Sequence, residues 1–182
     1  EIRITDCKTA ELVKIVENSY RDINIAFANE LSLISDNLGI NVYELISFTN
    51  NHPRVNILKP SCGVGGHCIA VDPWFLISQF PEESKIMQLA RKTNLDKTKW
   101  VISKIDFFIK NNFKKKDMKI GIFGITYKPN VNDLRESPAL EIANNLSNKY
   151  DVILCEPNFR EYKNFKIDTP NNLSLIHISE PT

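Results

Sequence analysis

The sequence is poor in the features that mark membrane-spanning, secreted or strongly charged proteins. No uninterrupted apolar run approaches the roughly 18 residues of a membrane-spanning helix, and no basic start with a following apolar stretch marks a secretion signal. The 23 Lys and Arg residues balance the 22 Asp and Glu residues to a formal net charge of +1. This balance offers no electrostatic attraction for nucleic acids or anionic membranes. We therefore expect a globular cytoplasmic protein that binds neither.

Cysteine is also scarce, with four residues in 182: Cys7, Cys62, Cys68 and Cys155. They are too few and too scattered for a disulfide framework. They form no CxxC pair, and His67 next to Cys68 is a poor start for a zinc site, so no metal is expected. Each cysteine is interpreted first as a small apolar residue and only then as a nucleophile.

Helical periodicity dominates the first 113 residues. A helix is predicted from Lys8 to Leu38, where Gly and Pro are absent, with Gly39 as its stop. Its apolar stripe comprises Leu12, Ile15, Val16, Tyr20, Ile23, Phe27, Leu31, Ile34 and Leu38. Apolar character surrounds this helix at residues 23–28, which indicates burial in a bundle or at a subunit interface. Asn41 is expected to cap a second helix with inward-facing Val42, Leu45, Ile46 and Phe48, and residues 82–113 form a third.

The pattern then changes to alternating strands and helices. Residues 119–125 and 151–155 are predicted strands, and residues 138–147 a helix with Pro138 at its first position. This βαβ order favours a parallel sheet in a separate α/β domain. Gly121 and Gly124 are spaced G-x-x-G rather than G-x-G-x-x-G, which argues against a full dinucleotide site there.

A loop of about 23 residues after residue 50 carries the first candidate chemistry. Three glycines between Gly63 and Gly66 precede Cys68, and Asp72 follows four residues later. If a helical turn begins after Cys68, thiol and carboxylate share a face, and backbone N–H groups favour a thiolate. A glycine-rich turn with a buried cysteine is the alternative.

Two further sets of polar residues are candidates for binding or catalysis. Lys14, Asn18 and Arg21 share one face of the long helix, where Lys14 could stabilise an oxyanion. Lys128 and Arg135 lie in the loop at the carboxyl end of the predicted strand, where α/β sheets bind ligands such as phosphates. For both sets the alternative is ordinary solvated surface.

Several motifs taken together resemble the UDP-glucose/GDP-mannose dehydrogenase family. They are KIVEN (14–18), NEL (29–31), HPRV (52–55), GGHCIAVDP (65–73) and YKP…DLRES (127–137). The combination HPRVNILKP…GVGGHCIAVDPWF resembles the bacterial members that oxidise UDP-N-acetyl-D-mannosamine. The resemblance covers roughly residues 8–157.

The resemblance implies a fold and a domain organisation. Residues 1–113 would be a helical dimerisation domain like the C-terminal domain of 6-phosphogluconate dehydrogenase, and residues 117–172 a truncated Rossmann-like UDP-binding domain. The family's N-terminal NAD-binding domain has no counterpart here, so the resemblance implies a fragment that is inactive by itself. A homodimer through the long helix is implied as well.

The resemblance also implies a reaction and a set of site residues. The family oxidises the sugar C6 alcohol twice with two NAD, through a thiohemiacetal and a thioester on the residue matching Cys68. The positions matching Lys14, Asn18 and Asp72 are also catalytic. Cofactor contact is implied for Arg135, and substrate contact for Arg21, His52, Arg54, Gly65, Tyr127 and Lys128.

Alternatives remain at this stage. The sugar could be that of UDP-N-acetylglucosamine or UDP-glucose, and a non-catalytic dimerisation module is a rival from another class. A cysteine hydrolase is disfavoured because His67 is the only histidine beside Cys68. The last ten residues, LSLIHISEPT, match a translated sequencing adapter, so we expect residues 173–182 to be an artefact. Resequencing across this junction tests that expectation.

Overall fold

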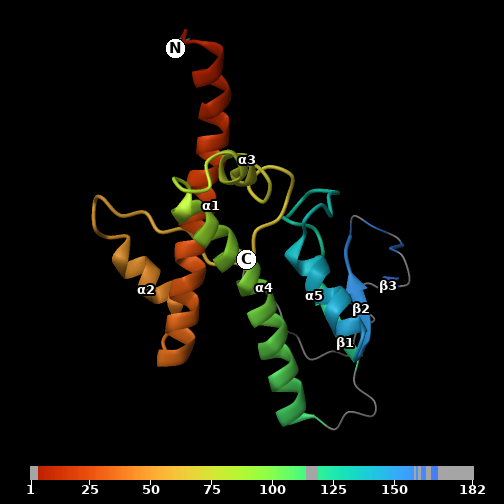
Figure 1. Ribbon diagram of the computed structural model, residues 1–182. Coiled ribbons are helices and arrows are strands. Elements are labelled where there is room, and N and C mark those ends of the chain that lie inside the picture. Colours follow the sequence, from red (N-terminus) through yellow and green to blue (C-terminus); the bar gives the residue numbers. More distant parts are fainter. Residues whose placement is uncertain (1–3, 114–118, 158, 160, 163–164, 168–182) are drawn as a thin grey trace. The chain divides into compact units, whose positions relative to one another are not determined.

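The computed structural model describes residues 4–113, 119–157, 159, 161–162 and 165–167. The order of its elements is α1 (Cys7–Leu38), α2 (Val42–Thr49), α3 (Pro73–Gln79), α4 (Lys85–Asn112), β1 (Lys119–Phe123), α5 (Pro138–Ser147), β2 (Asp151–Cys155) and β3 (Lys166–Ile167) (Figure 1). The chain divides into two compact units, Glu1–Leu95 and Asp96–Thr182. The expected artefact at 173–182 lies outside the described residues.

Helix α1 begins and ends at the signals that its sequence predicts. The side chain of Asp6 accepts a hydrogen bond from the backbone N–H of Thr9 at 3.1 Å, which caps the first turn. Gly39 takes a left-handed φ of 68°, and its N–H donates to the carbonyl of Asp36. The predicted helix is therefore confirmed to within one residue.

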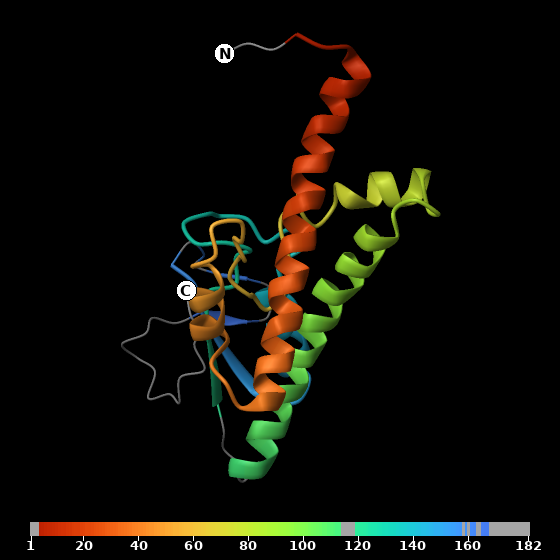
Figure 2. The same cartoon turned by 90° about the vertical axis from the view of Figure 1, so that its left-hand side faces the viewer.

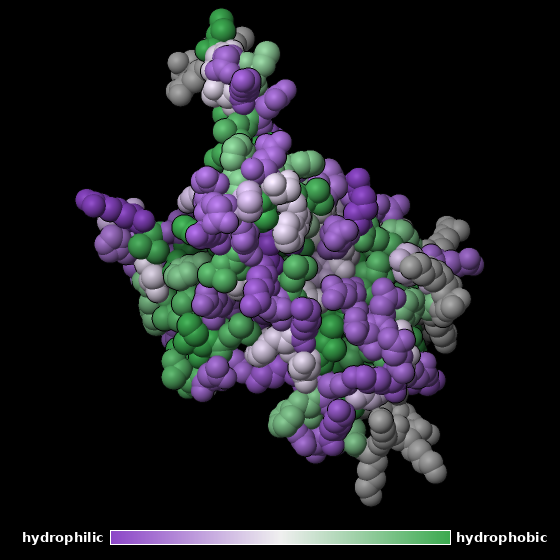
Figure 3. All heavy atoms as spheres, in the orientation of Figure 1, coloured by the Kyte–Doolittle hydropathy of each residue, from purple (hydrophilic) through white to green (hydrophobic). Residues whose placement is uncertain are grey.

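The face of α1 that packs inside the chain is not the apolar stripe. Its buried residues are small or polar: Asn18, Ser19, Asp22, Ala26, Ala28, Asn29, Ser32 and Ser35. Tyr20, Phe27 and Leu38 of the stripe are exposed, and Figure 3 shows hydrophobic side chains among hydrophilic ones along the first turns of α1. Phe27 is exposed within this chain, so burial of residues 23–28 inside a bundle of the chain does not hold at Phe27, and burial at a subunit interface stays a prediction. Small side chains let neighbouring elements approach α1 closely, and α2 and α3 pack against it.

Helix α2 is capped as predicted but turns one aromatic side chain outward. Asn41 accepts hydrogen bonds from the N–H groups of Tyr43 and Glu44. Ile46 is buried, whereas Phe48 is exposed, which corrects the inward orientation expected for Phe48. Helices α2 and α3 lie on opposite sides of α1 (Figures 1 and 2).

The long loop ends in α3, which the sequence did not predict, and α4 starts three residues later than expected. Pro73 occupies the first turn of α3, where its missing N–H has no intrahelical partner to lose. Residues 81–83 form a turn ahead of α4, and the side chain of Gln88 in α4 donates to the carbonyl of Pro81 and to Ser84 Oγ. Within the described residues, no helix is both long enough and apolar enough to cross a membrane.

The second unit contains a small parallel sheet with the order β1-β2-β3. β1 pairs in parallel with β2, with Gly121 opposite Ile153, as the βαβ prediction required. β1 ends at Phe123 rather than Ile125, because Gly124 turns the chain away with a φ of 82°. Helix α5 packs against β2, and Leu146 and Leu154 are fully buried in the core of this unit.

Candidate active site

The turn that carries Cys68 has the geometry expected from the sequence. The N–H groups of Val71 and Asp72 donate to the carbonyl of Cys68 at 3.0 and 2.8 Å, which closes one helical turn ahead of α3. Gly66 takes a φ of 85°, which a residue with a side chain rarely adopts. The Cys68 thiol is free and half-buried, so the alternative of a fully buried cysteine does not hold.

Asp72 is tied to α1 by one of the predicted residues. The side-chain amide of Asn18 donates to Asp72 Oδ2 at 2.6 Å, although 54 positions separate the two residues. Asn18 is 2% exposed and belongs to the packed face of α1. Because Asp72 heads α3 and its N–H is bonded to Cys68, this hydrogen bond connects α1 with the Cys68 turn.

Lys14 and Arg21 extend the same face of α1 outward. Lys14 lies one turn before Asn18, and its ammonium pairs with Glu17 Oε2 at 3.3 Å with a side chain 67% exposed. Arg21 is exposed as well. The structure thus brings Asn18 and Asp72 into contact, whereas Lys14 is paired within its own helix.

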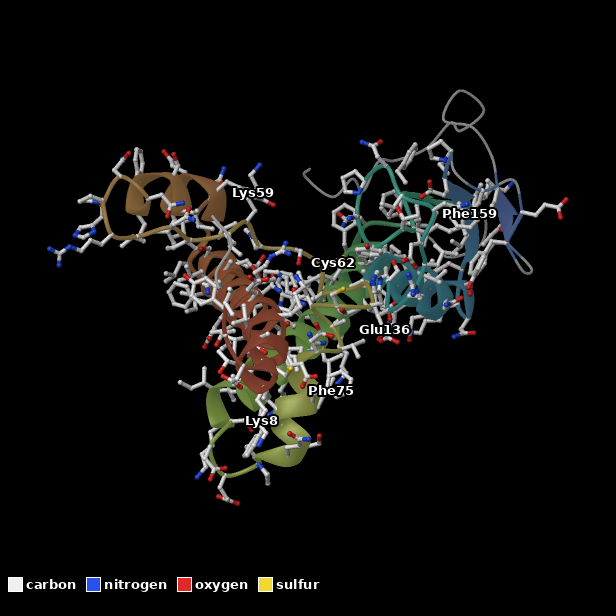
Figure 4. The ribbon with its side chains drawn as sticks, turned by 90° about the horizontal axis from the view of Figure 1, so that it is seen from above. Lys8, Lys59, Cys62, Phe75, Glu136 and Phe159 are labelled. Atoms are coloured by element: carbon white, nitrogen blue, oxygen red, sulfur yellow. The ribbon has the colours of Figure 1, made fainter. Side chains whose placement is uncertain are left out.

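His52 and Arg54 are not brought to the Cys68 turn. Both are exposed in the turn after α2, where the N–H of Arg54 donates to His52 Nδ1 at 3.2 Å. That turn lies across α1 from α3 (Figures 1 and 2). Gly65 is half-buried in the loop itself. In Figure 4, Lys59 and Cys62 mark the segment that leads from α2 past α1 toward α3, where Phe75 lies.

A buried polar network behind this loop was missed by the sequence analysis. Arg91 Nη1 meets Asp22 Oδ1 at 2.6 Å, with side chains 3% and 1% exposed. Asn94 donates to the same carboxylate oxygen at 2.8 Å and accepts from Asn29 at 2.8 Å. Burial raises the pKa of Asp22 above its usual value, against the opposing effects of Arg91 and Asn94. The available signal was the spacing of Asn18, Asp22 and Asn29 along one helix face.

The candidate residues of the second unit lie in the loop between β1 and α5. Lys128 Nζ lies over the Tyr127 ring, 5.5 Å from the ring centroid. Arg135 forms a bidentate ion pair with Asp133, in which Nε donates to Oδ1 at 3.0 Å and Nη2 donates to Oδ2 at 2.7 Å, and its side chain is 63% exposed. Buried Glu156, which the sequence analysis did not single out, accepts the N–H of Ile125 at 3.0 Å and fixes the start of this loop.

The fold can be compared with solved structures before any site residue is assigned. It is similar to the fold of a UDP-glucose dehydrogenase from Pyrobaculum islandicum at 22% identity with a TM-score of 0.77, over 90% of this chain and 40% of that structure. Residues 8–96 match the central domain of the UDP-glucose/GDP-mannose dehydrogenase family, and residues 121–179 match its UDP-binding domain. The chain belongs to this family.

Three relatives illustrate the similarity. A UDP-N-acetyl-D-mannosamine dehydrogenase of Campylobacter jejuni is 48% identical over 99% of this chain and 44% of its own length. A UDP-N-acetyl-mannosamine dehydrogenase of Staphylococcus aureus is 44% identical with a TM-score of 0.79, over 89% of this chain and 38% of that structure. The corresponding enzyme of Pyrococcus horikoshii is 34% identical with a TM-score of 0.78, over 94% and 44%.

The comparisons also set the extent of the match. The chain spans less than half the length of the curated relatives, 44% of the Campylobacter jejuni protein and 40% of that from Salmonella typhi. The enzymes of this family are NAD-dependent oxidoreductases. The match to the UDP-binding domain reaches residue 179 and so includes part of the tail at 173–182.

Proposed function

We propose that this chain supplies the nucleophile and the UDP-binding part of a nucleotide-sugar 6-dehydrogenase. Its substrate is UDP-N-acetyl-D-mannosamine, which is oxidised to the uronate, a precursor for surface polysaccharides. The relatives named for that sugar, at 48% identity, support this substrate. In this proposal residues 1–113 form the helical dimerisation domain and residues 117–172 the Rossmann-like UDP-binding domain of a cytoplasmic enzyme.

The observation that carries the proposal is the half-exposed Cys68 thiol on a turn anchored by Asn18 and Asp72. The first oxidation gives an aldehyde at C6. Cys68 Sγ adds to that carbon, the carbonyl π bond breaks, and its oxygen takes a proton to form a thiohemiacetal. The second oxidation leaves a thioester, which water opens to release the uronate and the thiol. A covalent anchor keeps the intermediate in place between the two oxidations.

Three further side chains have roles in this proposal. Asp72 assists proton removal and water activation, and the Asn18 hydrogen bond holds its carboxylate at one orientation. Lys14 stabilises the oxyanion. For this role its ammonium must leave Glu17 and contact the substrate instead. The exchange is inexpensive because an exposed ion pair contributes only about 0–1 kcal/mol.

Substrate contacts are proposed for both units of the chain. Tyr127 and Lys128 contact the UDP part of the substrate, supported by the match to the UDP-binding domain and by a cation above an aromatic ring. Arg21 and Gly65 lie on the elements that carry Asn18 and Cys68. The turn at residues 50–54, which carries His52 and Arg54, lies across α1 from α3 (Figures 1 and 2). These two residues therefore contact a substrate bound elsewhere than at this chain's own Cys68.

The described residues do not fit the binding of NAD as a whole. In a dinucleotide site a glycine-rich turn leads directly from the strand into a helix N-terminus. Here a long loop separates β1 from α5, and the N-terminus of α5 is occupied by Ser137, whose hydroxyl accepts the Leu140 N–H at 3.3 Å. NAD supplies the hydride acceptor in this family, and this chain offers Arg135 as a contact once it parts from Asp133.

The test uses an enzyme of the relatives' length that carries these residues. Cys68→Ala should lower uronate formation by a factor on the order of 10³ or more. Cys7→Ala, an exposed free thiol, is the matched control and should leave the rate unchanged. In Cys68→Ser, mass spectrometry should detect an aldehyde or a covalent ester instead of free uronate. Normal activity of both Cys68 variants refutes the proposal.

Comparing turnover of three UDP-sugars tests the choice of sugar. UDP-N-acetyl-D-mannosamine should be oxidised faster than UDP-N-acetylglucosamine and UDP-glucose. Activity on UDP-glucose alone would overturn the assignment.

A second candidate is a non-catalytic dimerisation module, favoured by the outward apolar stripe of α1. Tyr20, Phe27 and Leu38 are each more than half exposed, which is unusual for large apolar side chains on one helix. The proposed homodimer would cover this stripe, and a mass near twice 20.9 kDa in solution would support it. Full activity after both Cys68→Ala and Lys14→Ala would favour the module over the enzyme.

A further inference from the structure

Residues 61–72, which carry Cys68 and are called the Cys68 loop below, are held at their start by a buried asparagine. The proposed mechanism gives this asparagine no role. Asn29, with no exposed surface, accepts the backbone N–H of Ser61 on its Oδ1 at 2.7 Å. Its Nδ2 donates to Asn94 Oδ1 at 2.8 Å. Both ends of the amide are therefore engaged, one by the loop and one by α4.

The network behind Asn29 restricts that amide to one orientation. Asn94 donates to the carboxylate and to the backbone carbonyl of Asp22, at 2.8 and 3.1 Å, so its oxygen is turned toward Asn29. Arg91 holds the same carboxylate at 2.6 Å. Asn29, Asn94 and Asp22 Oδ1 are each hydrogen-bonded in this network, while Asp22 Oδ2 and Arg91 Nε have no hydrogen-bond partner. The bonded groups favour one arrangement, because the loss of a partner would leave a further desolvated polar group.

Two asparagines of α1 thus hold the two ends of the segment at residues 61–72. Asn29 lies eleven positions after Asn18, close to three turns at 3.6 residues per turn, so both amides lie on one helix face about 16 Å apart. Asn29 binds the loop at Ser61, and Asn18 binds it at Asp72. Between them the hydroxyl of Ser61 donates to the carbonyl of Gly63 at 2.5 Å, which shapes the approach to the glycines.

We propose that Asn29 is a positioning residue for the Cys68 thiol. It acts through the Ser61 N–H: losing that bond frees the start of the loop, while the Asn18–Asp72 bond still holds its end. Cys62, which is buried directly after Ser61, should then become accessible, and the turn that carries Cys68 should be held to α1 by the Asn18–Asp72 bond alone. The inference rests on the proposed function only in taking Cys68 as the nucleophile.

The test measures thiol alkylation in the whole 182-residue chain and in its variants. Iodoacetamide is applied over a series of urea concentrations below the unfolding transition, and mass spectrometry of peptides separates the cysteines. In Asn29→Ala, Cys62 should be alkylated about tenfold faster or more, since an unpaired buried donor corresponds to roughly that factor. The increase should depend weakly on urea, as local opening does.

Two further variants separate this role from general destabilisation. Asn24→Ala removes an amide of the same helix that bonds only to the Tyr20 carbonyl among the interactions described, and should leave alkylation unchanged. Ser61→Pro removes the N–H from the loop side, together with the hydroxyl bond to Gly63, without substituting a residue of α1 or α4, and should reproduce Asn29→Ala even where that variant folds poorly.

The proposal is overturned by parental alkylation rates in folded Asn29→Ala or Ser61→Pro. It is also overturned by an increase that follows urea as steeply as global unfolding. In an enzyme of the relatives' length, Asn29→Ala should lower kcat about 10- to 100-fold with KM little changed, and an unchanged kcat contradicts the positioning role. Full activity of Cys68→Ala with altered alkylation in Asn29→Ala would refute the proposed function and leave the loop anchor standing.

Discussion

Removing Arg91 alone should strongly destabilise the first unit, and removing its carboxylate partner as well should restore much of the loss. The Arg91 and Asp22 side chains are 3% and 1% exposed and meet at 2.6 Å. Breaking a buried pair by deleting one charge costs about 3–5 kcal/mol, because the other charge stays desolvated without a partner. We therefore expect Arg91→Met to lower the free energy of unfolding by that amount, a shift of roughly 1–2 M in the urea midpoint.

The pH dependence of this variant gives a second, independent check. Burial already raises the pKa of Asp22, and the loss of Arg91 removes the largest influence that lowers it. A carboxyl group with a raised pKa in the folded state favours folding when protonated, and this contribution is lost as the pH rises through the folded pKa. The deficit of Arg91→Met should therefore be smaller at pH 5 than at pH 7.

Circular dichroism during urea unfolding measures both effects. Asp22→Asn in the Arg91→Met background should recover at least about 1 kcal/mol, and Lys92→Met, an exposed cation of the same helix, should change stability by no more than about 0.5 kcal/mol. A double variant no more stable than Arg91→Met, or an Arg91→Met chain with the parental midpoint, refutes the reasoning.

Three other outcomes are expected. Ser137→Ala should destabilise the second unit by about 1–2 kcal/mol in thermal unfolding, because it removes both the cap of α5 and the 2.7 Å bond to the Ile125 carbonyl; an unchanged midpoint would contradict this. Asp106, whose pKa is lowered chiefly by its hydrogen bond from Lys149, should stabilise the fold above its usual pKa and lose that contribution as the pH falls below about 4. Unfolding free energies of Asp106→Asn should therefore converge with the parent only in acid, and a difference independent of pH would count against it. Gly39→Ala should cost about 1 kcal/mol through its left-handed φ alone, since a Cβ there meets no atom within 4 Å; a neutral result would refute that cause.

Local signals in the sequence predicted most of the elements. Gly39 and Asn41 marked the boundary between α1 and α2, and Pro138 marked the start of α5. These residues act through their own backbone, so the rest of the fold does not change their effect. β1 and β2 were predicted from short apolar runs, and β1 was predicted two residues too long because the left-handed Gly124 was interpreted as strand. β3 was not predicted.

The packing of α1 could not be predicted from periodicity. A stripe of large apolar residues indicates a face that avoids water, but it does not say what covers that face. Within this chain the covered face carries Asn18, Asp22 and Asn29. For Asn18 solvated surface was one of the two interpretations, and Asp22 was not singled out. Their partners are 54 to 72 positions away on the Cys68 loop and α4, or 32 away at Ser61, and no local pattern reports such contacts.

The candidate site was likewise predicted in part, through its local turn and not through its long-range contacts. Cys68 and Asp72 were predicted from the spacing within one turn, and their turn is present. The contact of Asn18 with Asp72 was not derivable from spacing, nor was the placement of His52 and Arg54 across α1. The roles of all these residues stay proposals.

The Asn29 anchor consists of a carboxamide and a peptide N–H, neither of which carries a charge or titrates near neutrality. The Lys14 ammonium, by contrast, stands in water beside Glu17, where dissolved ions screen it within about 8–10 Å. Added salt should consequently weaken the attraction of the Lys14 ammonium for a charged ligand, while the backbone that carries the Cys68 thiol keeps its conformation. Ionic conditions therefore offer a way to adjust the electrostatics at this locus independently of its geometry.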